Sequence, residues 1–183
     1  MGSTLSRLGS SLCGRTSCQV VLVGLDNAGK TTALCKLKSG DTEIGAIYPS
    51  TGINMETLLY RNVEFKVWDV GGQQSLRELW KHHFPDAEGI IYIVDSTDRR
   101  RIDQCKEEIH AILQDTKRKG IPFLMLANKQ DLPDAMTPEE LKSVIGLDAG
   151  RDLEVHIQPS CAAIGEGLKE GVEWLYAAIM ERR

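Results

Sequence analysis

The sequence lacks both an excess of positive charge and any long apolar segment. Its 183 residues hold 22 Lys and Arg against 26 Asp and Glu, a net charge of −4. Proteins that bind nucleic acid replace phosphate counterions with a concentrated basic surface, so we expect no nucleic-acid partner and interpret the basic runs at 99–101 and 117–119 as solvated helix ends. No apolar run approaches the roughly 18 residues of a membrane-spanning helix, so any membrane contact requires a surface anchor.

The cysteines show neither the even number nor the spacing of a disulfide or zinc framework. There are five, none in a CxxC pair, and no charged-then-apolar signal peptide precedes them. We therefore expect a reducing, cytoplasmic setting. The length suits one buried core and is short for two typical domains.

From Gln19 onward, short apolar runs alternate with longer helical patterns, which is typical of parallel strands joined by crossover helices. The sequence predicts an α/β fold with a mixed, mostly parallel six-stranded sheet and helices on both faces. It predicts one domain over residues 19–183, preceded by a separate segment over residues 1–18. The expected strands are residues 20–23, 90–94 and 123–127, with an antiparallel hairpin formed by residues 53–60 and 63–69. The expected helices are residues 30–38, about 99–119, 137–145 and 166–180.

A phosphate-binding motif follows the first strand directly. Residues 24–31 read GLDNAGKT, with the spacing Gly24-x4-Gly29-Lys30-Thr31 between an apolar strand and a helical pattern. Glycines let the backbone approach phosphates, and successive N–H groups bind the anion at the helix N-terminus. Lys30 then places a charge on the terminal phosphates, and the Thr31 hydroxyl is a Mg²⁺ ligand. Kinases, ATPases and GTPases share this loop, so it predicts only a nucleoside triphosphate site.

A second motif identifies the base. Residues 128–131 read NKQD and follow the strand at 123–127, where ligand loops of an open parallel sheet gather. The Asp131 carboxylate can accept two hydrogen bonds from N1–H and the exocyclic amine of guanine, and adenine offers no matching pair of donors. An unpaired buried carboxylate costs several kcal/mol, which is of order 10³-fold in discrimination. The two motifs together predict GDP or GTP with Mg²⁺.

A third motif, Asp69 to Gln73, follows the second hairpin strand. Asp69 offers a carboxylate to a Mg²⁺-bound water, Gly72 a backbone N–H to the γ-phosphate, and Gln73 an amide. We predict that Gln73 orients the attacking water and that Lys30 assists by stabilising the charge.

These motifs, in this order, closely resemble the Arf and Arf-like family of small GTPases. The resemblance covers essentially the whole chain and also includes PSTGIN at residues 49–54 and SCA at residues 160–162. It implies that a backbone N–H of the SCA block faces the guanine oxygen. The residues implied to bind nucleotide are Asp26, Asn27, Ala28, Gly29, Lys30, Thr31, Thr32, Gly72, Asn128, Lys129, Asp131, Leu132, Ser160, Cys161 and Ala162. The residues implied to hold Mg²⁺ are Thr31, Ser50 and, through water, Asp69.

The chain departs from the family pattern in two respects. Ser50 stands where the family usually has threonine; its hydroxyl is our choice for the second Mg²⁺ ligand, and Thr51 is the alternative if the loop changes register. The aromatic triad that faces effectors in the family maps onto Ile53, Trp68 and His83, so two of its rings are replaced. Ile53 and His83 either pack locally or form a specialised surface for effector proteins.

The N-terminus has the pattern of a lipid anchor. Met1-Gly2-Ser3-Thr4-Leu5-Ser6 fits N-myristoylation at Gly2, and three leucines at helical spacing form one face of a predicted amphipathic helix. By composition alone the segment also fits a disordered tail. The resemblance favours a reversible membrane anchor, released when GTP binding slides the hairpin, and implies a place on the Golgi or another endomembrane. The leucines of that face are Leu5, Leu8 and Leu12.

Turnover is expected to be slow. Asp26 stands where some GTPases have glycine, close to the γ-phosphate, and no arginine is placed by sequence to act in cis. We expect an activating protein to supply an arginine in trans, worth about 10³ to 10⁵ in rate, and an exchange factor to release GDP. The predicted function is a GTP-dependent switch in membrane trafficking. The alternative is a GTP-binding interaction module with little hydrolysis, against which Gln73 argues; a P-loop kinase would leave residues 128–131 without a use.

Overall fold

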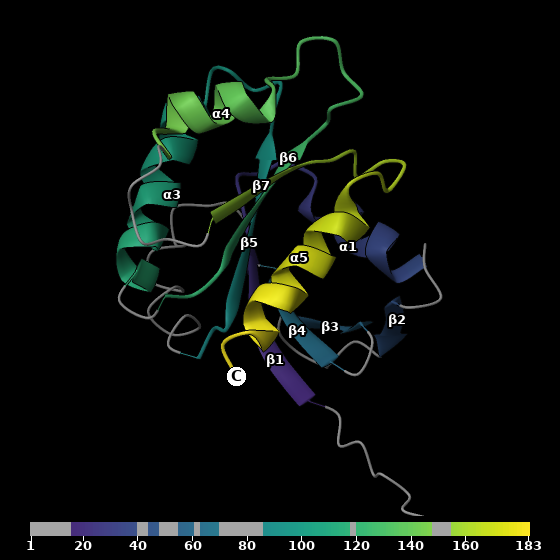
Figure 1. Cartoon of the computed structure of the whole chain (residues 1–183). Coiled ribbons are helices and arrows are strands. Elements are labelled where there is room, and N and C mark those ends of the chain that lie inside the picture. The colour runs from purple at the N-terminus through teal and green to yellow at the C-terminus, as the bar shows by residue number, and fades with distance from the viewer. Residues whose placement is uncertain are drawn as a thin grey trace, which may run out of the picture.

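The structure is a computed structural model that describes residues 16–39, 44–47, 55–60, 63–69, 86–117, 120–147 and 155–183. Seven strands and four helices make up this part of the chain (Figure 1). In chain order they are β1 (Thr16–Val23), α1 (Lys30–Ser39), β2 (Ile44–Ile47), β3 (Met55–Tyr60), β4 (Val63–Asp69), β5 (Gly89–Asp95), α3 (Ile102–Lys117), β6 (Phe123–Asn128), α4 (Pro138–Ile145), β7 (Val155–Pro159) and α5 (Leu168–Met180).

The strands form one mixed sheet in the order β2-β3-β4-β1-β5-β6-β7. Strand β1 pairs in parallel with β4 and β5, and β6 and β7 continue in parallel, whereas β2, β3 and β4 pair antiparallel. The predicted α/β fold and mostly parallel sheet are confirmed. The predicted number of six strands is wrong, because the described residues contain seven. Strand β2 is only four residues long, Ile-Gly-Ala-Ile, and is too short to show an alternating pattern.

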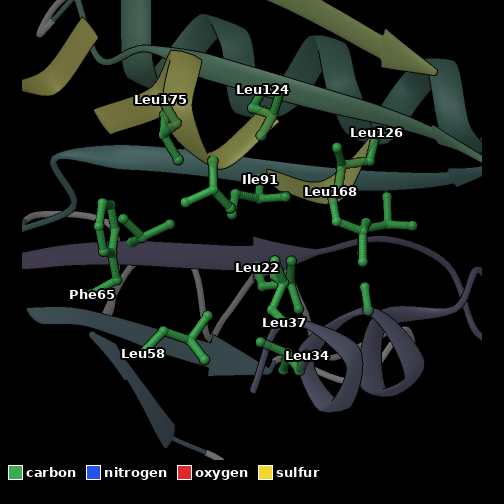
Figure 2. Close-up of a cluster of buried hydrophobic side chains, with 14 of the residues drawn as sticks. Leu22, Leu34, Leu37, Leu58, Phe65, Ile91, Leu124, Leu126, Leu168 and Leu175 are labelled. Carbon is green, nitrogen blue, oxygen red and sulfur yellow. The ribbon is translucent and has the colours of Figure 1, made fainter. Parts of the chain in front are cut away.

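Helices cover both faces of the sheet, as predicted. Alternate residues of each central strand point to opposite faces, so Val20 and Leu22 of β1 join one buried cluster and Val21 and Val23 join the other. Helices α1 and α5 cover the first face and α3 and α4 the second (Figure 1). Figure 2 shows the first cluster, where leucines of α1 and α5 meet the sheet. Burial on both faces explains the continuous apolar runs of β5 and β6.

Helix ends follow local capping chemistry. Thr137 accepts a hydrogen bond from the Glu140 N–H, Glu140 accepts one from the Thr137 N–H, and Pro138 opens α4. Helix α3 begins at Ile102, three residues later than predicted, because the Asp98 carboxylate accepts from the Arg101 N–H and closes a turn first. None of the helices in the described ranges is long and apolar enough to cross a membrane.

Strand β1 begins earlier than the sequence indicated. It pairs with β4 from Thr16 onward, and the Cys18 side chain is fully buried. Residues 16–18, which the sequence pattern places in the N-terminal segment, therefore belong to the sheet. Their polar, irregular composition hides this, because the strand with which they pair is β4, 47 residues further along the chain (Thr16 opposite Val63).

Candidate nucleotide-binding site

The carboxyl ends of the parallel strands carry the predicted site loops to one edge of the sheet. Strands β1 and β5 are neighbours, and the chain leaves β1 into α1 on one face of the sheet and leaves β5 into α3 on the other. Ligands of open α/β sheets bind at such a switch point. The loop after β1 holds residues 24–29, and the loops after β5, β6 and β7 hold residues 96–101, 129–137 and 160–167. The geometry thus places the phosphate motif, the NKQD motif and the SCA motif together.

The phosphate loop has a backbone that only certain residues adopt. Gly24 has φ 147°, and a Cβ there would lie 2.3 Å from the Ile93 carbonyl oxygen of the neighbouring strand. Asn27 is left-handed with φ 63°, an uncommon conformation that asparagine tolerates better than most residues. Lys30 is buried, and its Nζ donates to the carbonyl oxygens of Gly24 and Leu25 at 3.0 and 2.9 Å. The ammonium therefore lies over the start of the loop.

This loop fits a polyphosphate. Within the described residues, the main-chain N–H groups of Asp26, Asn27 and Gly29 have no hydrogen-bond partner, while Ala28 donates to Leu25. Helix α1 begins at Lys30, so its positive end faces the same loop. Unpaired amides at a helix N-terminus, beside a buried lysine, make an anion site. Those amides and Lys30 would hold the phosphates.

Asn128 fastens three loops together. Its side chain is 2% exposed; Nδ2 donates to the Ala28 carbonyl and Oδ1 accepts from the Ala162 N–H, both at 2.8 Å. Gly29 passes so close that a Cβ there would lie 2.3 Å from Asn128 Nδ2. The phosphate loop, the NKQD loop and the SCA loop are thereby held as one unit. The predicted binding residue Asn128 is thus placed to shape the site through its neighbours.

The predicted guanine residues surround Asp131. Its exposed carboxylate accepts from the Cys161 thiol, with Sγ and Oδ1 3.2 Å apart, and the Gln130 N–H donates to the Ser160 carbonyl. The Ser160 hydroxyl is buried and has no hydrogen-bond partner within the described residues. Leu132, which follows Asp131, is 42% exposed. A polar edge next to exposed apolar surface suits a planar base.

Lys129 links the NKQD loop to the end of β5. The residue is left-handed, with φ 69°, and its Nζ lies 2.5 Å from Asp95 Oδ2. Burial alone would raise the pKa of Asp95, but hydrogen bonds from Lys129 and Thr97 outweigh it, and the pKa lies below its ordinary value. The carboxylate therefore stays ionised and holds Lys129 in its strained conformation.

One contact of the phosphate loop was not predicted. Arg101, in the turn before α3, donates from Nη1 to Asp26 Oδ1 at 2.8 Å and from Nη2 to the Asp26 carbonyl at 3.1 Å. Its Nε donates to Asp98 Oδ2 at 2.5 Å. The sequence showed only three successive arginines after a strand. The signal that could have singled out Arg101 is its i+3 spacing from Asp98, at the carboxyl end of a strand next to β1.

The predicted Mg²⁺ and catalytic residues are only partly within the described residues. Thr31 and Thr32 lie in the first turn of α1, and both are exposed. The main chain of Asp69 pairs with Leu22, two residues before Gly24, so β4 ends beside the phosphate loop. When bound, Mg²⁺ neutralises charge on the β- and γ-phosphates. Ser50, Thr51, Gly72 and Gln73 lie outside the described residues, as do the side chains of Trp68 and Asp69 and the residues Gly2, Leu5, Leu8, Leu12, Ile53 and His83.

Comparison with known proteins agrees with this geometry. The sequence profile of the ADP-ribosylation factor family matches residues 3–179. Among solved structures, the chain is similar to the Arl6 (BBS3) small GTPase from Trypanosoma brucei, determined with the bound nucleotide analogue GppNp. The identity is 34%, the match covers 92% of this chain and 100% of that one, and the TM-score is 0.79. The chain therefore belongs to the ADP-ribosylation factor family, whose members are small GTPases that bind GTP and GDP with Mg²⁺ and hydrolyse GTP.

Proposed function

We propose that this GTPase is a molecular switch that cycles on and off membranes and recruits effectors in intracellular vesicle or protein trafficking. Small GTPases of this family act through regulators and effectors. The specific partners proposed for this chain are an exchange factor, an activating protein and effectors that contact the surface around Ile53, Trp68 and His83. It would reside in the cytoplasm and, reversibly, on the Golgi or another endomembrane.

The observation that carries the proposal is how the hairpin is attached to the sheet. In the described residues, β2, β3 and β4 connect to the rest of the sheet through a single ladder, between β4 and β1. Strand β4 ends beside the phosphate loop, and β1 follows the N-terminal segment directly. A shift along this one ladder would therefore link nucleotide state to the N-terminal anchor.

The sequence of β4 restricts how far the hairpin could move. Phe65 is buried in the core, and its neighbours in the strand are Glu64 and Lys66. A slide by one residue would turn a charged side chain into the core, whereas a slide by two would replace Phe65 with Val63 or Val67. The proposed switch thus has two discrete registers, two residues apart, rather than a continuum.

Slow hydrolysis is part of the proposal. Among the described residues, Arg101 is the arginine whose guanidinium bonds to the phosphate loop. Its nitrogens donate hydrogen bonds to the carboxylates of Asp98 and Asp26. It is therefore not free to stabilise charge on the γ-phosphate, and an arginine supplied in trans by an activating protein remains the expected source. Gln73 would orient the attacking water.

A vesicle-binding experiment tests the proposed switch. The full chain, N-myristoylated at Gly2, is loaded with GDP or GppNp and sedimented with vesicles that contain anionic lipid. Because one myristoyl chain alone binds only marginally, we expect several-fold more protein on vesicles in the GppNp state, where a second contact becomes available. Unmyristoylated Gly2→Ala protein is the control and should stay in solution in both states. Equal partitioning of the GDP and GppNp forms would contradict the switch.

A further inference from the structure

Arg101 joins the phosphate loop to the turn that precedes α3. One edge of its guanidinium is fixed by Asp98, which accepts from Nε and, through its other oxygen, from the Arg101 main-chain N–H. The two terminal nitrogens bond to Asp26. Nη1 donates to the side-chain carboxylate, and Nη2 donates to the main-chain carbonyl oxygen. The planar fork thus makes contacts in two directions, which the single ammonium of lysine could not reproduce.

Asp26 places a negative charge inside a loop that binds an anion. Its side chain is 63% exposed, and it directly follows Gly24 and Leu25, the two residues whose carbonyls bind the Lys30 ammonium. A carboxylate there repels a bound polyphosphate. GTP carries one more phosphoryl group than GDP and more negative charge, so an uncompensated Asp26 disfavours GTP more than GDP.

We propose that Arg101 is a positioning and charge-compensating residue that sets the preference of the site for GTP over GDP. It holds the Asp26 carboxylate against the start of α3 and cancels its charge. The inference rests on the nucleotide binding of the family and not on the proposed membrane cycle. A failure of vesicle binding would therefore leave it standing.

The size of the effect follows from exposure. The side chains of Arg101 and Asp26 are 33% and 63% exposed. Water therefore weakens both the attraction between these two side chains and the interaction of each with the phosphates. We expect loss of Arg101 to lower the ratio of GTP affinity to GDP affinity by about two- to fivefold. High salt should reduce the change, because exposed charges are screened over about 10 Å at 0.1 M ionic strength.

The experiment measures dissociation constants for fluorescent GDP and for fluorescent GppNp, with Mg²⁺, in matched variants. Arg101→Gln removes the charge, and Arg101→Lys keeps it without the fork. Asp26→Asn and the double variant Asp26→Asn/Arg101→Gln complete a cycle. The control is Arg99→Gln, which removes the same charge two residues away; the Arg99 guanidinium pairs with Glu140 of α4 at 3.7 Å. Thermal unfolding of each variant confirms that it folds.

The inference predicts a specific pattern. Arg101→Gln lowers the GTP-to-GDP affinity ratio, Arg101→Lys lowers it less, and Arg99→Gln leaves it unchanged. In the Asp26→Asn background, adding Arg101→Gln lowers the ratio by a smaller factor than in the parent protein, because no carboxylate remains to be positioned and only the direct attraction of the Arg101 charge is lost. Equal weakening of both nucleotides by Arg101→Gln would show that Arg101 only braces the loop and would overturn the inference. A fall in the ratio that is equally large in the Asp26→Asn background would overturn it as well.

Discussion

Replacing Asn128 with alanine should both destabilise the fold and loosen the nucleotide. The Asn128 amide is buried and fills two hydrogen bonds of 2.8 Å, to the Ala28 carbonyl and from the Ala162 N–H. Both residues are buried, at 1% and 3% exposure, so water cannot easily replace the lost partner. A buried polar group left without a partner costs about 1–3 kcal/mol, so two cost about 2–6 kcal/mol. That is a large share of the free energy of unfolding of a typical domain, which is roughly 5–15 kcal/mol.

Urea unfolding followed by circular dichroism measures this loss, at two GDP concentrations with Mg²⁺ so that weaker ligand binding is separated from weaker folding. The matched control is Gln104→Ala, which removes an exposed amide that bonds Glu108 at 3.5 Å and should change stability by less than about 0.5 kcal/mol. Dissociation of GDP should also accelerate, because three loops lose their common tie. An unfolding free energy for Asn128→Ala that matches the Gln104→Ala value would refute this account of Asn128.

Three further outcomes follow from the site and the core. Cys161→Ala should weaken GDP binding about three- to tenfold, because the Asp131 carboxylate loses a donor. Cys161→Ser keeps a donor towards Asp131 and should bind GDP as the parent protein does. Equal losses of GDP affinity in the two variants, measured by titration, would refute the role of the thiol. Burial raises the pKa of Cys105 to about 12, so its thiol is almost entirely protonated at pH 8. An alkylating reagent at pH 8 should therefore modify exposed Cys35 long before buried Cys105, as followed by mass spectrometry. Equal modification rates of the two cysteines in the folded protein would contradict this. The lowered pKa of Asp95 makes its stabilisation complete above the ordinary value of 3.8 and lost as pH falls through the folded pKa. Asp95→Asn should therefore flatten the acid side of the stability curve below about pH 4, and an unchanged slope there would contradict this role.

Local patterns predicted the central part of this fold and failed at its margins. The apolar runs of β5 and β6 are buried on both faces and could be recognised without knowing their neighbours. Strand β2 and the first residues of β1 could not, because their pairing partners, not their own composition, place them in the sheet. The start of α3 shifted for a related reason, since a side-chain turn at Asp98 competes with the helix.

The site divides in the same way. Motif spacing placed the phosphate loop and the NKQD loop at one edge of the sheet, because phosphate and guanine impose their own chemistry on nearby residues. The contacts that shape these loops were hidden: Arg101 and Asp26 are 75 residues apart, and Asn128 and Ala28 are 100 apart. No periodicity links such pairs. They depend on the order of the strands, which brings the ends of β1, β5 and β6 side by side.

The nucleotide that the purified protein carries is the most direct test of the account, which assigns residues 24–31, 128–131 and 160–162 to one guanine-nucleotide site. The full chain is purified with Mg²⁺, denatured, and the released small molecules are separated by chromatography and identified by mass. We predict GDP or GTP at close to one per chain, and a strong reduction in Asp131→Asn protein prepared in the same way. Recovery of an adenine nucleotide in its place would contradict the assignment of Asp131 and with it the proposed switch.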